Sequence, residues 1–338
     1  RQSPARRLAR MLSSARCSGI LRPARFLIHR RSFRAPTTAL NHCVEVVRQQ
    51  DRERFLCNTC VRSPAPRKHF CHTRKHVLGR FAAHEARPAL FALHAFNIET
   101  ANIRSTTSTV EIGRMRLMWW RQAIEQGRAG KPPDHPVAQA LAQAQARHSL
   151  SFRFLEQLLD AREADLETKQ PADLRQLLSY CERTAGALQL LGLECAGVVD
   201  NEQAELAAVH VGCALGLATL LRGTAHHASK GCTYIPADVA SRHSVDLSQV
   251  LRAESSPALR DAVVELATEA VTHLLAARSL QPTLPESACS SLLPATVASL
   301  ILERLQKAGY APFEAETVAP SGARLQLQLL WNDWRGTY

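Results

Sequence analysis

The sequence has few aromatic residues, few glycines and no long uncharged apolar segment. Aromatics make up 5% of the 338 residues, and there are 15 glycines. The nearest approach to a membrane span, residues 206–221, contains His210 and ends at Arg222, so it falls short of the ~18–20 uncharged apolar residues required. We expect a buried core helix there. The sequence shows neither an internal repeat nor the alternation typical of strands, and it is rich in helix formers.

Acidic residues are absent from the start of the chain. Residues 1–44 contain ten arginines and no acidic residue. Without these arginines the chain has 32 basic and 30 acidic residues, so its net charge would be about +2 instead of +12. An arginine-rich, serine-containing, acid-free leader is typical of a mitochondrial presequence, which we predict over residues 1–36. The alternative is a basic arm for RNA or anionic lipid. A second basic stretch, with six positive and no negative charges from Arg62 to Arg80, indicates an insertion at about 58–80.

The ten cysteines lack the spacing of a disulfide framework, and we interpret most of them as small buried hydrophobic residues. One group has the spacing of a Cys2His2 zinc site: Cys57 and Cys60, followed by His72 and His76. The segment between them has two prolines and only Phe70 as a bulky apolar residue. A solvated basic loop is therefore the favoured interpretation of this insertion.

The apolar periodicity predicts an all-α domain of about ten helices over residues 37–338. Pro88 suits the first turn of one helix, and the Pro-, His- and Arg-rich segment before it, Cys60–Glu85, is expected to be a loop. The expected helices cover residues 41–57, 88–103, 110–126, 137–147, 150–167, 173–196, 202–221, 256–280, 292–307 and 325–334.

Six segments occur in an order that resembles the squalene/phytoene synthase superfamily. The resemblance covers roughly residues 43–236 and implies an isoprenoid-synthase-like helical bundle. The segments are LFALHAFNIE, IGRMRLMWWRQAIE, HPVAQAL, LLDAREADLE, YCERTAGALQLLGL and VGCALGLATLLRGTAHHASKGCTYIP.

The enzymes of that superfamily join two prenyl diphosphates, which implies two Asp-x-x-x-Asp motifs on facing helices. Residues i and i+4 share a helix face, so both carboxylates can serve one cluster of Mg²⁺, an ion that prefers oxygen ligands. Here the four positions align with Ala101, Ser105, Gly223 and His227. Because none is a carboxylate, we predict a pseudoenzyme with no metal at these positions and no cofactor.

Other superfamily landmarks are present. The resemblance makes Tyr180, Arg222 and Tyr234 remnants of a prenyl or phosphate pocket, although Arg222 is equally compatible with a structural ion pair. The adjacent His226 and His227 are interpreted as a polar helix end. Two further groups have a plainer interpretation: Trp119 and Trp120 with Met115 and Met118 as core rather than lipid cavity, and Glu163, Asp165 and Glu167 as a solvated helix face.

Within the superfamily, the segments FALHAFNIE, IGRMR and WRGTY resemble the mitochondrial assembly factors of respiratory complex I. The resemblance implies a non-catalytic protein on the matrix side of the inner membrane that acts in membrane-arm biogenesis. The implied partners are complex I subunits or other assembly factors, with peripheral membrane association, a hydrophobic ligand and no nucleic acid. Two alternatives remain at this point: an active head-to-head prenyl diphosphate transferase, and an RNA- or ribosome-associated mitochondrial protein.

Overall fold

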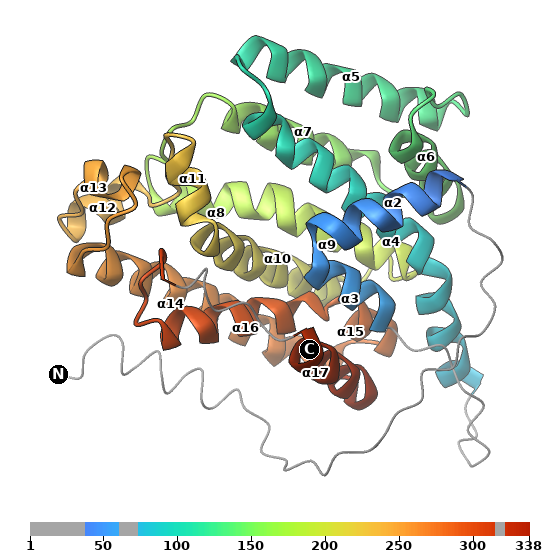
Figure 1. The fold of residues 1–338 in the computed structure, drawn as a ribbon. Coiled ribbons are helices and arrows are strands. Elements are labelled where there is room, and N and C mark those ends of the chain that lie inside the picture. Colours follow the sequence, from blue (N-terminus) through green and yellow to red (C-terminus); the bar gives the residue numbers. More distant parts are fainter. Residues whose placement is uncertain (1–37, 61–73, 315–321) are drawn as a thin grey trace.

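The computed structural model describes residues 38–60, 74–314 and 322–338, and every regular element in these ranges is helical (Figure 1). The prediction of an all-α fold is thereby confirmed, whereas the presequence predicted over 1–36 lies outside the described residues. The elements are α2 (Thr38–Gln50), α3 (Arg52–Cys60), α4 (Arg74–Thr106), α5 (Val110–Arg128), α6 (Pro136–His148), α7 (Phe152–Asp165), α8 (Leu174–Cys181), the π-helical η1 (Glu182–Gly186), α9 (Ala187–Cys195), α10 (Glu202–Arg222), α11 (Thr224–Ser229), α12 (Ala237–Arg242), α13 (Leu247–Leu251), α14 (Pro257–Leu280), the 3₁₀ turn η2 (Gln281–Thr283), α15 (Glu286–Ser291), α16 (Pro294–Lys307) and α17 (Gly322–Arg335).

Helix α10 lies at the centre of the bundle (Figure 1). It packs against α14, α16 and η1, and its side chains help to form one of two buried hydrophobic clusters. The other cluster joins α2, α4, α5, α6, α7 and α9. Within the described part of the chain, α10 alone is long and apolar enough to cross a membrane by length and composition, but 61% of its most apolar window is buried inside the bundle. The predicted core helix is therefore confirmed.

The contact between α10 and η1 is unusually close because glycines face each other. A Cβ atom added to Gly212 would lie 2.3 Å from the Cα of Gly186, so only glycine fits at position 212. A single π-helical turn inserts one extra residue into a helix and shifts the side chains that follow. Here η1 lies between α8 and α9 and directs Thr184 and Ala185 toward the interior cavity described below.

Two sequence predictions differ from the structure. The helix expected over 41–57 is divided at Asp51, whose carboxylate accepts a hydrogen bond from the Arg54 backbone N–H (3.0 Å) and thereby caps the start of α3. The loop expected over Cys60–Glu85 is wrong from Arg74 onward, because α4 begins there and Pro88 lies inside it. Proline removes one backbone donor but is tolerated where the helix is held by packing on its other residues.

Candidate functional site

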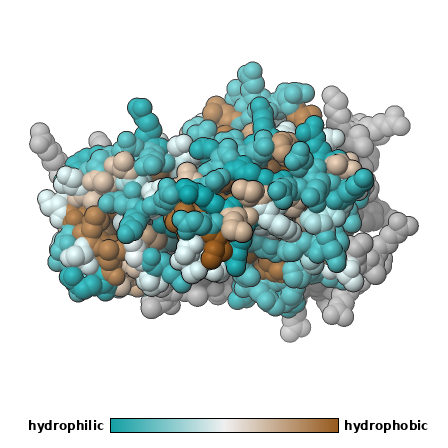
Figure 2. Space-filling view, turned by 90° about the horizontal axis from the view of Figure 1, so that it is seen from above, coloured by the Kyte–Doolittle hydropathy of each residue, from teal (hydrophilic) through white to brown (hydrophobic). Residues whose placement is uncertain are grey.

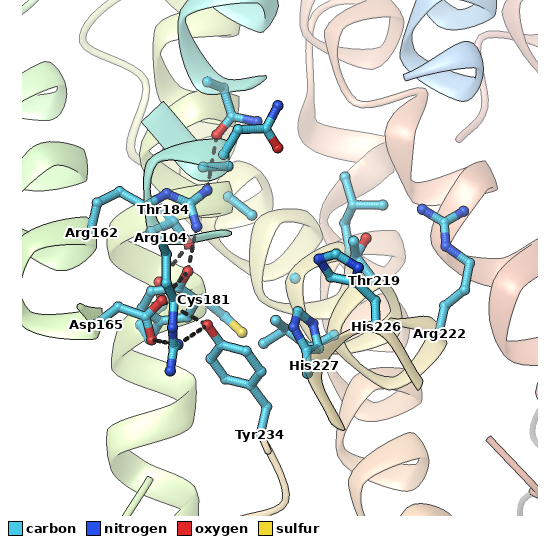
Figure 3. Close-up of a pocket in the computed structure, with 18 of the residues that line it drawn as sticks. Arg104, Arg162, Asp165, Cys181, Thr184, Thr219, Arg222, His226, His227 and Tyr234 are labelled. Carbon is cyan, nitrogen blue, oxygen red and sulfur yellow. Dashed lines mark hydrogen bonds and ion pairs between the residues drawn. The ribbon is translucent and has the colours of Figure 1, made fainter. Parts of the chain in front are cut away.

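A cavity of about 530 Å³ lies among α3, α4, α7, α8, η1, α10, α11 and α16. Apolar side chains from α10 and α16, including Leu215, Leu220 and Val297, form part of its lining. Charged side chains form much of the rest: Asp51, Glu53, Arg54, Arg104, Arg162, Asp165, Arg222 and Lys230. Figure 3 shows Arg104, Arg162, Asp165 and Tyr234 on one side of the cavity, and Arg222 with His226 and His227 on the other.

The first wall is organised around Asp165, the last residue of α7, whose side chain is 7% exposed. Arg104 of α4 donates to one of its carboxylate oxygens (2.8 Å) and also to the Tyr234 hydroxyl (2.7 Å). The Tyr234 hydroxyl in turn donates to the other carboxylate oxygen (2.7 Å). Burial lowers the pKa of Arg104, but Asp165, Tyr234 and Cys232 together outweigh burial, and the net change is upward. In this wall, the Asp165 carboxylate, the Arg104 guanidinium and the Tyr234 hydroxyl therefore bond to one another, and the charges of Asp165 and Arg104 neutralise each other.

Arg162 of α7 continues this wall without a carboxylate partner among the described residues. Its guanidinium donates to the Tyr180 hydroxyl and to the Asn97 side-chain oxygen (3.2 Å), while its buried Nε has no hydrogen-bond partner. The Tyr180 ring stacks on Tyr234 with centroids 5.7 Å apart. Burial raises the pKa of Tyr180 to about 12 and also raises the pKa of Tyr234, so both tyrosines stay protonated and can donate.

The opposite wall contains two more arginine–carboxylate pairs. Arg222, at the end of α10, lies 2.6 Å from the Glu53 carboxylate of α3. Arg54 lies 3.1 Å from the Asp51 carboxylate. Burial raises the pKa of Asp51, and the positive charge of Arg54 opposes that rise. Each of the three carboxylates that line the cavity in the described structure is thus held by an arginine.

His227 and Lys230 lie beside the end of α10. The His227 ring meets Tyr234 edge-on, with centroids 4.6 Å apart. Burial, followed by the charges of His226 and Arg104, lowers the pKa of His227 to about 4, so the ring is neutral at physiological pH. The Lys230 ammonium lies 3.5 Å from the Ser105 backbone oxygen.

The structure brings together most of the site residues that the sequence singled out. Three of the four aligned motif positions, Ala101, Ser105 and His227, line the cavity. Gly223 lies at the end of α10 outside the lining, and a Cβ added there would lie 2.8 Å from the His227 Nε2 atom. Tyr180, Arg222 and Tyr234 also line the cavity, while their descent from a substrate pocket stays a prediction.

The remaining predictions have mixed outcomes. Trp120 is buried as expected, but Met115, Met118 and Trp119 are exposed on the surface of α5, so the prediction of plain core is wrong for them. Seven cysteines, all those whose side chains the structure describes, are buried, which confirms their interpretation as small hydrophobic residues. In the zinc candidate, Cys57 packs in the core, but His72 lies outside the described residues and that prediction stays untested.

Sequence reasoning missed Arg104 and Arg162 and placed Asp165 on a solvated face, which is wrong. The spacing did contain a signal for Asp165. It follows Leu158 and Ala161 by seven and four residues, which are the intervals of one helix stripe, and both of those side chains are buried. A carboxylate on a buried stripe requires a charged partner, and no sequence pattern identified Arg104 on another helix as that partner.

A family model for squalene/phytoene synthases matches residues 74–331. The chain belongs to the squalene/phytoene synthase family. It is 32% identical over 298 residues to a human protein named NADH dehydrogenase (ubiquinone) complex I, assembly factor 6, a match that covers 88% of this chain and 83% of the human one. It is 26% identical over 159 residues to phytoene synthase 3, chloroplastic, of Zea mays, covering 46% and 37% of the two chains.

A solved dehydrosqualene synthase has the same fold. The TM-score is 0.70 at 17% sequence identity, and the superposition covers 88% of this chain and 95% of that enzyme. The predicted isoprenoid-synthase-like bundle of the squalene/phytoene synthase type is therefore confirmed. In this family member, the cavity described above has an arginine on each of its lining carboxylates.

Proposed function

We propose that this squalene/phytoene synthase family member is a non-catalytic mitochondrial assembly factor for respiratory complex I. Relatives with the name of complex I assembly factor 6 match most of the chain, at 32% identity for the human protein and 31% for that of Drosophila melanogaster. The proposal places the protein on the matrix side of the inner membrane, peripherally associated with it. Its partners there are complex I subunits or other assembly factors during biogenesis of the membrane arm.

The state of the cavity carboxylates carries the non-catalytic part of the proposal. Mg²⁺ requires carboxylate oxygens that are free to coordinate it. Asp51, Glu53 and Asp165 instead accept charge-assisted contacts from arginines at 2.6–3.1 Å. The four aligned motif positions supply no replacement, since they hold Ala101, Ser105, Gly223 and His227. The described cavity therefore offers a diphosphate several cations but no carboxylate pair to hold Mg²⁺.

The cavity itself supports a binding role. Its volume of about 530 Å³ lies within the range of small-molecule sites, and its lining combines apolar side chains with cations. The proposal therefore includes a hydrophobic ligand in this cavity. The ligand would contribute to the stability of the folded protein in proportion to its occupancy.

The test is depletion of the protein in its own cells, followed by native-gel analysis of all respiratory complexes. We expect selective loss of complex I, with a membrane-arm intermediate accumulating, and recovery on re-expression of the chain. In parallel, the purified protein is incubated with farnesyl diphosphate and Mg²⁺, with a dehydrosqualene synthase as the positive control. Normal complex I after depletion would overturn the assembly role, and Mg²⁺-dependent consumption of the diphosphate would overturn the non-catalytic role.

A further inference from the structure

The lining of the cavity carries more positive than negative charge. Its three carboxylates are each paired with an arginine: Asp51 with Arg54, Asp165 with Arg104, and Glu53 with Arg222. Arg162 and Lys230 also line the cavity, and neither has a carboxylate partner among the described residues. A concave site whose lining has unpaired cations attracts an anionic ligand.

The Arg162 guanidinium has only neutral hydrogen-bond partners in the described structure. One of its terminal nitrogens donates to the Tyr180 hydroxyl, and the other donates to the Asn97 side-chain oxygen (3.2 Å). Each terminal nitrogen carries two N–H groups, so each keeps one that these two bonds do not use. Tyr180 also contacts Asp165 (3.4 Å), but that carboxylate already pairs with Arg104 (2.8 Å). The charge of Arg162 is therefore available to a ligand.

The groups beside Arg162 are hydrogen-bond donors. Because a guanidinium only donates, the Asn97 side-chain oxygen faces Arg162, and the amide N–H groups of Asn97 are left for other acceptors. The Tyr180 hydroxyl accepts from Arg162, and burial raises its pKa to about 12, so it keeps its own proton. All three side chains line the cavity. An ionised carboxylate has only acceptors and matches the guanidinium fork, so it suits this set of donors.

The position of the second unpaired cation limits the charge of the ligand's polar end. Lys230 lies beside Ser105, which is eight residues from Asn97 in α4, or about 12 Å at the rise of an α-helix. Near Asn97, Arg162 thus supplies one unpaired positive charge. A phosphate monoester carries a charge of about −1.5 to −2 at pH 7, and a diphosphate carries more. A carboxylate, with one negative charge, is the better match.

The rest of the lining indicates that the body of the ligand is apolar. Leu215 and Leu220 of α10 and Val297 of α16 line the same cavity. On the face of the molecule that Figure 2 shows, hydrophobic patches are scattered within a mainly hydrophilic surface. Figure 3 shows Arg162 on one wall of the cavity and Thr219 of α10 on the other. A molecule with one anionic end and an apolar body can therefore contact both kinds of lining at once.

We propose that the cavity binds a long-chain monocarboxylate. Its carboxylate would accept hydrogen bonds from Arg162, Asn97 and Tyr180, and its hydrocarbon chain would lie along the apolar side chains of α10 and α16. The binding requires no metal ion, because the guanidinium supplies the positive charge. This inference rests on the hydrophobic ligand in the proposed function and names its chemical class.

The experiment measures displacement of cis-parinaric acid, a fluorescent long-chain monocarboxylate, from the full chain. The competitors are dodecanoate, dodecanol, dodecyl phosphate, acetate, and farnesyl diphosphate with and without Mg²⁺. We expect dodecanoate to bind about tenfold or more tightly than dodecanol, because the alcohol brings no charge to Arg162. Acetate has the carboxylate without the chain and should not compete at the same concentration. Dodecyl phosphate and farnesyl diphosphate should bind more weakly than dodecanoate.

Variants at position 162 separate the effect of charge from that of folding. Arg162→Met should lower the affinity for dodecanoate about tenfold or more and leave that for dodecanol unchanged. Arg162→Lys keeps the charge without the planar fork, so it should retain part of the preference for dodecanoate. The matched control is Arg175→Met, which removes an exposed arginine of α8 outside the cavity lining and should leave both affinities unchanged. Circular dichroism checks that each variant is folded.

The comparison of head groups on the unaltered chain decides the inference even if Arg162→Met does not fold. Equal affinities for dodecanoate and dodecanol would overturn it, as would tighter binding of dodecyl phosphate, or tighter binding of farnesyl diphosphate that requires Mg²⁺. An equal loss of dodecanoate affinity in Arg162→Met and Arg175→Met would also overturn it.

Failure of this inference is distinguishable from failure of the proposed function. If dodecanoate has no advantage over dodecanol while depletion still removes complex I, the carboxylate assignment fails and the assembly role stands. If dodecanoate binds in the expected pattern while complex I is normal after depletion, the assembly role fails and the carboxylate site stands.

Discussion

Removal of Arg104 tests whether the Asp165 network stabilises the fold as the geometry indicates. In Arg104→Met, the Asp165 carboxylate keeps its hydroxyl donors but loses its positive partner at 2.8 Å, at a position where it is 7% exposed. Breaking a buried ion pair by removing one partner costs about 3–5 kcal/mol. Because the tyrosine hydroxyls still donate to Asp165, we expect the lower end, about 3 kcal/mol, or a fall in the melting temperature of about 5 °C.

The assay is urea unfolding followed by circular dichroism, together with thermal melts. The matched control is Arg114→Met, which removes an arginine from the exposed pair with Glu167 and should cost less than about 1 kcal/mol. The double variant Arg104→Met/Asp165→Leu should recover most of the lost stability, since no buried charge is then left alone. The reasoning would be refuted if Arg104→Met stayed within about 1 kcal/mol of the unaltered chain, or if the double variant were no more stable than the single one.

Three further perturbations test the packing, the pH dependence and the C-terminal contact. Gly212→Ala should destabilise the protein by about 3 kcal/mol, since its Cβ would lie 2.3 Å from a backbone atom, whereas Gly192→Ala, whose nearest contact is 3.8 Å away, should be neutral or stabilising in thermal melts. Burial and the neighbouring His210 lower the pKa of His273 from 6.5 to about 4. The contribution of neutral His273 to the free energy of unfolding should therefore be fully present above pH 6.5 and be lost as the pH falls toward 4. His273→Gln should weaken that pH dependence in urea titrations. Tyr338→Phe removes a buried hydroxyl that donates to the Ala277 backbone oxygen (2.7 Å). The free energy of unfolding should fall by about 1–2 kcal/mol in the same assay. An unchanged urea midpoint would contradict this expectation.

The sequence predicted the helices best where apolar periodicity was strong. The helix expected over 202–221 forms as α10 (Glu202–Arg222), and that expected over 256–280 forms as α14 (Pro257–Leu280). Helix ends that depend on one local contact were missed. The division at Asp51 requires its side chain to cap α3. Within a continuous apolar pattern, the sequence does not distinguish a capping aspartate from an aspartate on the solvated face of an unbroken helix.

The candidate site was predictable only in part. The family segments located Ala101, Ser105, Tyr180, Arg222 and Tyr234, which all line one cavity. The ion pair between Arg54 and Asp51 is local, since the two residues are three apart. The other two pairs in its walls could not be predicted, because each joins residues from different parts of the fold; Arg222 and Glu53, for example, are 169 residues apart. Periodicity specifies which side of a helix a residue occupies, whereas the identity of its charged partner depends on tertiary packing.

The arginine pairs in the cavity also limit how this protein could change by descent. A carboxylate introduced at position 105 would arise on the segment of α4 that Lys230 already approaches, with its ammonium 3.5 Å from the Ser105 backbone oxygen. The new carboxylate would pair with the Lys230 ammonium instead of coordinating Mg²⁺. Arg54, Arg104 and Arg222 would continue to pair with the other carboxylates. A metal site in this cavity would thus require several substitutions at once, because removal of one arginine alone would leave its carboxylate without a positive partner.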